Sequence, residues 1–143
     1  MPGDDPVVVL SEEESWSLLS SVSLGRLVTI LGGEPEIFPI NFVTQRRSVL
    51  FRTAQGTKLY SAVMGGQVSF EADGHTADEG WSVIVKGRAR LLSANDDILD
   101  AEQAPLLPWT ATVKPHFVRV IATEISGRRF KFGPEPDRES TFA

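Results

Sequence analysis

Positive charges and hydroxyl groups gather in one short stretch of the chain, Phe51-Arg52-Thr53-Ala54-Gln55-Gly56-Thr57-Lys58-Leu59. A β-prone segment runs into a glycine turn and then into a predicted helix. Arg52 and Lys58 bring fixed positive charges, and Thr53 and Thr57 bring hydroxyls beside the free amides of a helix start. A phosphate dianion binds donors of these kinds, so the stretch predicts a phosphate site. The alternative is a strand–turn–helix junction in which Thr57 is the N-cap and both basic residues are solvated.

The composition of the whole chain limits the kinds of chemistry and partner that such a site could have. Its 143 residues contain 41% hydrophobic and 23% charged side chains, which is typical of one globular domain. Cysteine is absent, so the sequence offers no disulfide, thiolate metal site or cysteine nucleophile. The net charge of −5 argues against nucleic acid as the main partner. The first residues lack a signal-peptide pattern, and no apolar run approaches the roughly 20 residues of a membrane span, so we expect a cytoplasmic protein.

The segments that must position the phosphate stretch have mostly strand-like periodicity. Apolar and β-branched residues alternate over residues 25–31, 36–43, 48–52, 67–72, 81–92 and 117–125, with turn signals between them. A further extended piece is expected at residues 7–10, and residues 73–80 are interpreted as a polar loop. The pattern predicts a mainly β fold, an antiparallel barrel of six to seven strands with a few short helices. A two-sheet sandwich is the alternative.

Short helices are predicted beside the strands, over residues 12–21, 58–64 and 98–104. The first begins with a capping box, in which Ser11 caps the helix and Glu14 reaches back to it. Gly65-Gly66 ends the second. We expect the chain to divide into a flexible N-terminal arm, a single domain and a polar, disordered tail, at residues 1–10, 11–132 and 133–143.

Short motifs that arrive in a fixed order give the sequence a family likeness. They are Gly25-Arg26-Leu27, Pro39-Ile40-Asn41-Phe42, Phe51-Arg52-Thr53-Ala54, Gly56-Thr57-Lys58-Leu59, Phe70-Glu71, Gly80-Trp81-Ser82-Val83 and Gly87-Arg88-Ala89. In this order they resemble the pyridoxamine 5'-phosphate oxidase-like, FMN-binding split-barrel proteins. The most similar subgroup contains small single-domain members that include nitroimidazole-resistance-type reductases. The resemblance implies a split barrel and a homodimer with two equivalent flavin sites at the subunit interface.

The same resemblance implies which residues hold the phosphate of the cofactor. That cofactor would be FMN, with deazaflavin or FAD as alternatives. Arg52, Thr57 and Lys58 would contact the phosphate, and Thr53 would add a hydroxyl. The implied activity is that of a flavin-dependent oxidoreductase, which reduces or oxidises a small organic substrate that the sequence does not identify.

The resemblance also places residues beside the flavin ring. Backbone groups near Asn41 and Phe42 would bond its polar edge, and Trp81 and Ser82 would lie close to the ring or the ribityl chain. Asn41 also fits a hydrogen-bonded residue at a sheet edge, and Trp81 also fits a core or interface aromatic. Arg128-Arg129, after the last predicted strand, could hold a substrate anion or a second phosphate.

A different function remains open on the sequence alone, because no residue has the pattern of a dedicated acid or base. The chain could bind a flavin or another small ligand without turnover. His75 and His116 are interpreted as loop histidines, and two scattered histidines make no metal site.

Overall fold

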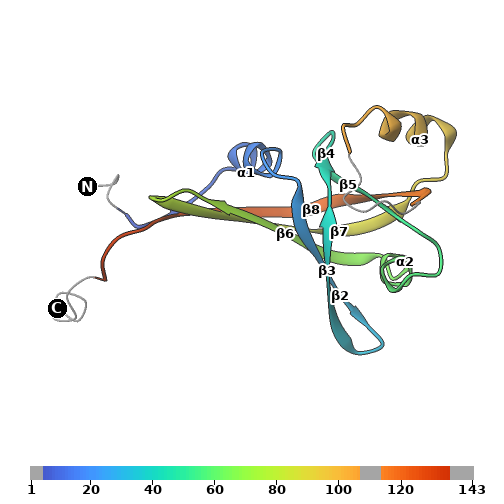
Figure 1. The fold of residues 1–143 in the computed structure, drawn as a ribbon, viewed down its shortest axis with the longest axis horizontal. Helices are drawn as coiled ribbons and strands as arrows, with labels where there is room; N and C mark the ends of the chain where they lie inside the picture. Colours follow the sequence, from blue (N-terminus) through green and yellow to red (C-terminus); the bar gives the residue numbers. More distant parts are fainter. Residues whose placement is uncertain (1–4, 107–113, 136–143) are drawn as a thin grey trace.

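The computed structural model describes residues 5–106 and 114–135, which form one curled sheet with helices around it (Figure 1). In chain order the elements are β1 (Val7–Val9), α1 (Glu12–Leu19), β2 (Leu24–Leu31), β3 (Glu34–Asn41), β4 (Val43–Thr44), β5 (Ser48–Thr53), α2 (Lys58–Met64), β6 (Gln67–His75), β7 (Glu79–Leu91), α3 (Asn95–Glu102) and β8 (His116–Lys131). The predicted strands and helices are therefore present.

The strands form a single antiparallel sheet in the order β3-β2-β6-β7-β8-β5-β4, and β1 pairs with β8. The sheet curls into a half-barrel, which confirms the predicted split barrel and excludes the two-sheet sandwich. The split lies between β2 and β6. These strands pair only over residues 26–28 and 69–71, beyond which the β2–β3 hairpin leaves the body of the sheet (Figure 1).

The core fills the inside of the curl with one face of each strand. Alternation puts every second side chain on this face, and Leu27, Phe70 and Val85 are fully buried there. The rings of Phe42 and Phe70 meet edge to face with centroids 4.6 Å apart. Helix α1 covers part of this core with Trp16 and Leu19.

Strands β6 and β7 are longer than predicted, and with β8 they extend to one side as an arm (Figure 1). The prediction of a polar loop at residues 73–80 is wrong, because both strands continue through it and leave a turn of residues 76–78. The strand continues through these polar residues. Gly74 lies opposite Trp81 in the ladder and leaves space for the indole. A Cβ on Gly74 would lie 2.8 Å from Trp81 Nε1.

Strand β8 also runs farther than predicted and ends at Lys131. The basic cluster of Arg128 and Arg129 therefore lies within the strand, where it pairs with β1 on one side and β7 on the other. Residues Val7–Val9, in the segment expected to be a flexible arm, form β1. Of the predicted tail, residues 136–143 lie outside the described residues.

Candidate functional site

The predicted phosphate stretch folds as a strand–turn–helix junction between β5 and α2. Gly56 takes the positive φ of 85° that the turn requires. Thr57 caps α2, because its Oγ1 accepts a hydrogen bond from the Tyr60 amide at 3.0 Å and donates one to the Ala54 carbonyl at 2.8 Å. The Thr53 hydroxyl lies 3.3 Å from that of Thr57. The two hydroxyls therefore lie next to each other at the turn.

Lys58 extends from this junction toward the β2–β3 hairpin. Its Nζ lies 2.6 Å from Glu36 Oε1 on β3, and 62% of its side chain is exposed. Thr53, Thr57 and Lys58 together form a small basic and hydroxyl-rich site that we call the cradle. An anion that binds in the cradle must compete with the Glu36 carboxylate for Lys58.

Arg52 does not join the cradle. Neighbouring residues of a strand point to opposite faces, and Arg52 lies on the face of β5 opposite to Thr53. Its Nε donates to the Lys114 carbonyl at 2.9 Å, and its guanidinium carbon lies 5.1 Å from the centroid of the Phe117 ring. It also lines a pocket of about 230 Å³ beneath α3. Arg52 thus has protein partners where the sequence predicted a phosphate.

His116, which the sequence analysis interpreted as a loop residue, lies beside the cradle. It begins β8 and pairs with Thr53 across the β5–β8 ladder. Its ring is 5.7 Å from that of Tyr60 in the first turn of α2. The contact depends on strand pairing between distant parts of the chain. In the sequence, Pro115 before the histidine favoured a loop at this position.

Asn41 and Phe42, at the end of β3 and just after it, were predicted to lie beside a flavin ring, and they differ in environment. Asn41 ends β3 opposite Leu24 and is half-buried. Phe42 is fully buried, its ring packs on Phe70, and its amide donates to the Ser23 carbonyl at 3.0 Å. The Phe42 side chain is therefore part of the core.

Trp81 and Ser82 lie far from the cradle within one chain. The cradle is at the end of β7 marked by Leu91, since Leu91 pairs with Val118 and Thr53 pairs with the nearby His116. Trp81 lies ten residues farther along β7, which is about 33 Å at ~3.3 Å per residue. The indole and the Ser82 hydroxyl also point to opposite faces of the strand. One chain does not bring these residues to the cradle.

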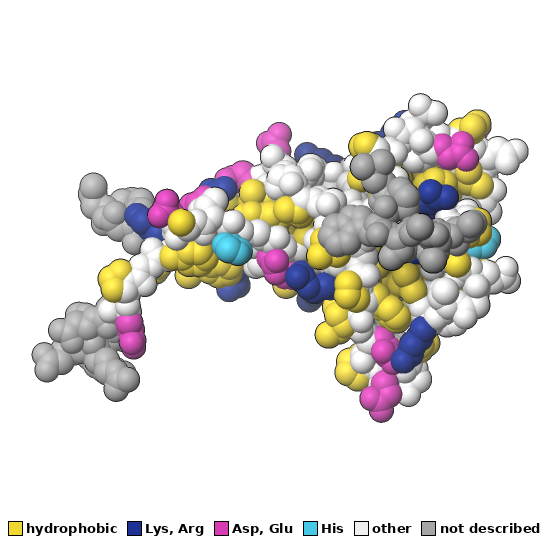
Figure 2. Space-filling model, in the orientation of Figure 1, with side chains coloured by type: hydrophobic (Ala, Val, Ile, Leu, Met, Phe, Trp, Pro, Cys, Tyr) yellow, Lys and Arg dark blue, Asp and Glu magenta, His cyan; other side chains and the backbone are white. Residues whose placement is uncertain are grey.

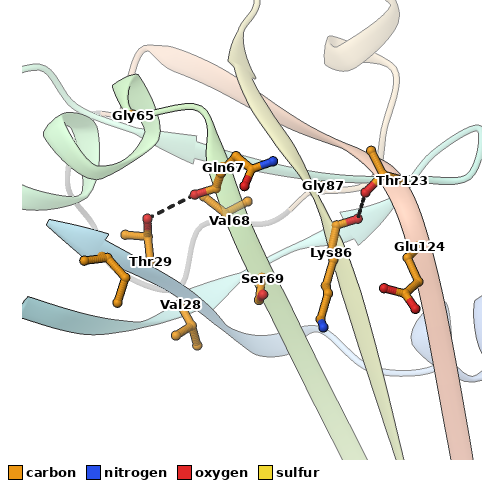
Figure 3. Close-up of a pocket in the computed structure, with 11 residues that line it drawn as sticks. Val28, Thr29, Gly65, Gln67, Val68, Ser69, Lys86, Gly87, Thr123 and Glu124 are labelled. Atoms are coloured by element: carbon orange, nitrogen blue, oxygen red, sulfur yellow. Dashed lines mark hydrogen bonds between the residues drawn. The ribbon is translucent and has the colours of Figure 1, made fainter. Parts of the chain in front are cut away.

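An open groove of about 630 Å³, which no sequence motif indicated, lies where β2 separates from β6 (Figure 3). Val28 and Ile30 of β2, Ser69 of β6, Lys86 of β7 and Glu124 of β8 line it together with Gly65 at the end of α2. The Lys86 side chain points along the groove between Ser69 and Glu124 in Figure 3.

Arg26 bridges two carboxylates on the same face of the sheet. Its Nη1 lies 2.6 Å from Glu71 Oε1 and 3.5 Å from Asp73 Oδ2. Burial raises the pKa of Glu71, and the neighbouring Asp73 raises it further, although Arg26 opposes both effects. This cluster holds β2 against β6 before the split.

The described residues hold no group of three or more His, Asp or Glu side chains that could bind a metal ion. Within the same ranges, no helix has the length and apolar character that crossing a membrane requires.

Comparison with known proteins places the fold in a family. The family model for pyridoxamine 5'-phosphate oxidase matches residues 11–129. The chain belongs to the pyridoxamine 5'-phosphate oxidase-like, FMN-binding split-barrel family. This finding confirms the family that the ordered motifs indicated.

Two mycobacterial proteins are similar to this member of the family. Protein Rv3129 of Mycobacterium tuberculosis, which has no characterised function, is 61% identical over 101 residues, or 71% of this chain and 92% of its own. The FAD binding protein of Mycobacterium smegmatis is 53% identical, with a TM-score of 0.80 over 87% of this chain and 99% of that one. An FAD-binding protein of Mesorhizobium loti shares the fold at 24% identity, with a TM-score of 0.72 over 86% of this chain and 97% of its own.

Proposed function

We propose that this protein binds a flavin whose phosphate lies in the cradle, and that the flavin makes it an oxidoreductase for a small organic substrate. The observation that carries the proposal is the strand–turn–helix junction, where the Thr53 and Thr57 hydroxyls lie 3.3 Å apart and Lys58, next in sequence to Thr57, begins α2 with an exposed side chain. Family membership and the flavin named for the Mycobacterium smegmatis relative support it.

The donors of the cradle fit a phosphate group. Lys58 supplies an exposed ammonium, and a charged hydrogen bond of this kind contributes about 1.5–3 kcal/mol. Thr57 is exposed and would donate to a phosphate by releasing the Ala54 carbonyl, whereas Thr53 is 2% exposed and supports Thr57 through the contact between their hydroxyls. Glu36 would lose its contact with Lys58 on binding, which reduces the net gain.

A bound flavin supplies the hydride or electron transfer that amino acid side chains cannot perform. The role of the protein chain is to bind the flavin and to orient it. Lys58 and the threonines fix the phosphate end, and the buried Phe42 holds the strand that leads from β3 to β4 in position. His116, which pairs with Thr53, places its ring near the cradle, where a ring nitrogen can form a hydrogen bond with a phosphate oxygen.

We propose further that the site is completed by a second copy of the chain. Trp81 and Ser82 lie about 33 Å from the cradle along β7, so they reach a flavin held there only from another subunit. Apolar side chains cover part of the arm on the face that Figure 2 shows. Val7, Val8, Ile84 and Phe132 are exposed on the arm, as a surface covered in a homodimer would be.

The first test is a visible absorption spectrum of the purified protein before and after incubation with FMN, FAD or deazaflavin and desalting. We expect a retained flavin band. In Arg52→Ala/Lys58→Ala we expect flavin affinity to fall at least tenfold, with Lys58→Ala alone giving most of the loss because Arg52 has other partners. Arg90→Ala is the matched control, since Arg90 is exposed on β7 away from both the cradle junction and the arm. Colourless protein under all conditions, or unchanged affinity in the double variant, would contradict the proposal.

Mixing two inactive variants tests whether the site is shared between subunits. Lys58→Ala and Trp81→Ala, each weak in flavin binding, should recover tight binding at about a quarter of the sites when dissociated and reassociated together, because half of the dimers are mixed and each has one intact site. Absence of recovery with normal dimers would place the whole site in one chain. Turnover with a reduced nicotinamide donor then separates an enzyme from a flavin-binding protein without activity.

A further inference from the structure

Helix α3 covers a pocket that lies apart from the cradle. The helix is fixed through Asp100, whose carbonyl accepts a hydrogen bond from Gln45 Nε2 at 2.9 Å and whose carboxylate lies 2.9 Å from Arg46 Nη2. Only Ala101 of this helix is buried, so the helix leaves a pocket of about 230 Å³ between itself and the ends of β5 and β8. That is the liquid volume of about eight water molecules at ~30 Å³ each, which is enough space for a small organic molecule.

Arg52 is fixed at the strand side of this pocket by two contacts. Its Nε donates to the Lys114 carbonyl at 2.9 Å, and its guanidinium carbon lies 5.1 Å from the centroid of the ring of Phe117, its partner in the β5–β8 ladder. Neither contact uses the Nη atoms as donors, and no ion pair among the described residues includes Arg52. A guanidinium that is already oriented loses little side-chain freedom when it binds a carboxylate through two parallel hydrogen bonds. Arg52 is therefore prepared to bind a planar anion.

The other side chains of the pocket limit the shape and charge of a ligand. Ile98, Leu106 and Phe117 line it and offer an apolar surface to a hydrocarbon group. Glu102 of α3 also lines the pocket, is exposed, and belongs to no ion pair in the part of the chain that the structure describes. Its negative charge repels a second negative charge on any anion that Arg52 holds. The pocket therefore favours a monocarboxylate over a phosphate or a dicarboxylate.

The pocket and the cradle are on opposite faces of β5. Arg52 and Thr53 are neighbours in this strand, and successive side chains of a strand point to opposite faces. Thr53 contributes to the cradle, whereas Arg52 lines the pocket. A ligand beneath α3 therefore does not occupy the space of an anion in the cradle.

We propose that the pocket beneath α3 binds a small monocarboxylate with an apolar body, an aromatic or branched aliphatic acid, whose carboxylate pairs with Arg52. The two Nη groups donate to the carboxylate, the apolar side chains contact the hydrocarbon body, and Glu102 disfavours dianions. This site goes beyond the proposed function and does not depend on it, because no residue of the cradle takes part. It gives Arg52 a ligand of a different kind from the phosphate that the sequence predicted.

Binding of fluorobenzoate to the full chain, followed by fluorine NMR, tests the proposal. We expect saturable binding with a Kd of about 1 mM. Arg52→Met should weaken binding about tenfold, and Arg47→Met is the matched control, because Arg47 is exposed in the turn between β4 and β5 and does not line the pocket. Ala104→Phe, which fills the pocket, should abolish binding. Gln103→Phe adds the same ring at an exposed position outside the pocket and should leave binding intact.

Two competitors test the charge of the ligand and the separation of the two sites. Terephthalate, a dicarboxylate, should displace fluorobenzoate from Glu102→Gln but not from the wild-type protein, and FMN should displace it from neither. Competition by terephthalate with the wild-type protein would overturn the role of Glu102.

The site itself has separate points of failure. Absence of saturation in the wild-type protein, or equal binding in Arg52→Met and Ala104→Phe, would overturn it. Displacement of fluorobenzoate by FMN would assign the acid to the cradle and overturn it as well. A chain that binds fluorobenzoate but no flavin would contradict the proposed function alone.

Discussion

The barrel end and the arm of this molecule share strands β7 and β8 but differ in how their surfaces are satisfied. At the barrel end, charged groups pair within the chain. Arg119 donates to Ser48 and Gln45, and Lys58 meets Glu36. On the arm, Val7, Val8 and Phe132 are exposed, and the buried Nε of Arg129 makes no hydrogen bond among the described residues, although Glu79 Oε1 lies 3.6 Å from it.

This difference indicates which region a single chain can form alone and which region a second subunit would cover. The cradle is built from residues close in sequence and held by caps and ladder pairs, so one chain suffices to form it. The arm presents apolar and unsatisfied groups of the kind that a subunit contact covers. Substitutions that alter one region at a time test this difference.

The largest effect is expected where the two regions join. Gly87→Ala places a Cβ against the Ile121 carbonyl of β8, and the strand pair must separate to admit it. We expect a loss of about 3 kcal/mol in the free energy of unfolding, measured by urea denaturation. Gly133→Ala is the control, since no atom lies within 4 Å of a Cβ there. Equal stability of the two variants would show that the ladder is looser at the bulge than the structure has it.

A smaller effect should be confined to the barrel end. Arg119 is 14% exposed and its Nη atoms lie 2.8 Å from Ser48 Oγ and 2.9 Å from Gln45 Oε1. Arg119→Met removes a charged donor from both and from Asp100 of α3, so we expect about 1.5–3 kcal/mol of destabilisation. Arg90→Met, at the exposed position opposite Arg119 in the β7–β8 ladder, should change stability little. Thermal unfolding that is insensitive to both changes would contradict this prediction.

Two helix starts give a matched pair of opposite sign. Ser11 caps α1 with a complete capping box, whereas Ala94, at the start of α3, makes no side-chain cap bond. Ser11→Ala should cost about 1 kcal/mol of stability, and Ala94→Ser should add about 0.5–1 kcal/mol, as measured by chemical denaturation. A stabilising change at Ser11 or a destabilising one at Ala94 would contradict the cap assignments.

The smallest effect concerns the dependence of stability on pH. Burial and Asp73 raise the pKa of Glu71 above 4.5, so the folded protein holds this proton more tightly than the unfolded chain. The contribution of Glu71 to stability is therefore greatest below pH 4.5 and falls as the pH rises through the folded-state pKa. Glu71→Gln should flatten the pH profile of stability above pH 4.5. An unchanged or steeper fall would show that other groups produce the slope.

Local signals predicted much of the fold. Helix α2 has the predicted bounds because Thr57 caps it and glycines end it. The extension of β6 and β7 was missed, because a glycine that accommodates an indole across the ladder looks like a turn residue in the sequence. Strand patterns rest on apolar alternation, and Asp73 and His75 keep its polar positions, but Gly74 between them has no apolar side chain to mark the other face.

The candidate site was predictable only where it is local. Thr53, Thr57 and Lys58 are close in sequence, and local signals place them at one strand–turn–helix junction; that they bind a phosphate stays a prediction. The opposite direction of Arg52 follows from strand alternation, but its partners on β8 and beneath α3 come from distant parts of the chain. The place of His116 depends on the β5–β8 register, which one sequence does not determine.

The ion pair of Lys58 with Glu36 links a helix start to the β2–β3 hairpin, whose strand pairing with β6 is limited to residues 26–28. This ion pair is a tether that holds the hairpin against the start of α2, and it also neutralises the charge of Lys58. When an anion takes Lys58, the hairpin loses that tether, and faster amide hydrogen exchange along β3 would then report occupancy of the cradle. A signal of this kind requires no colour and no turnover.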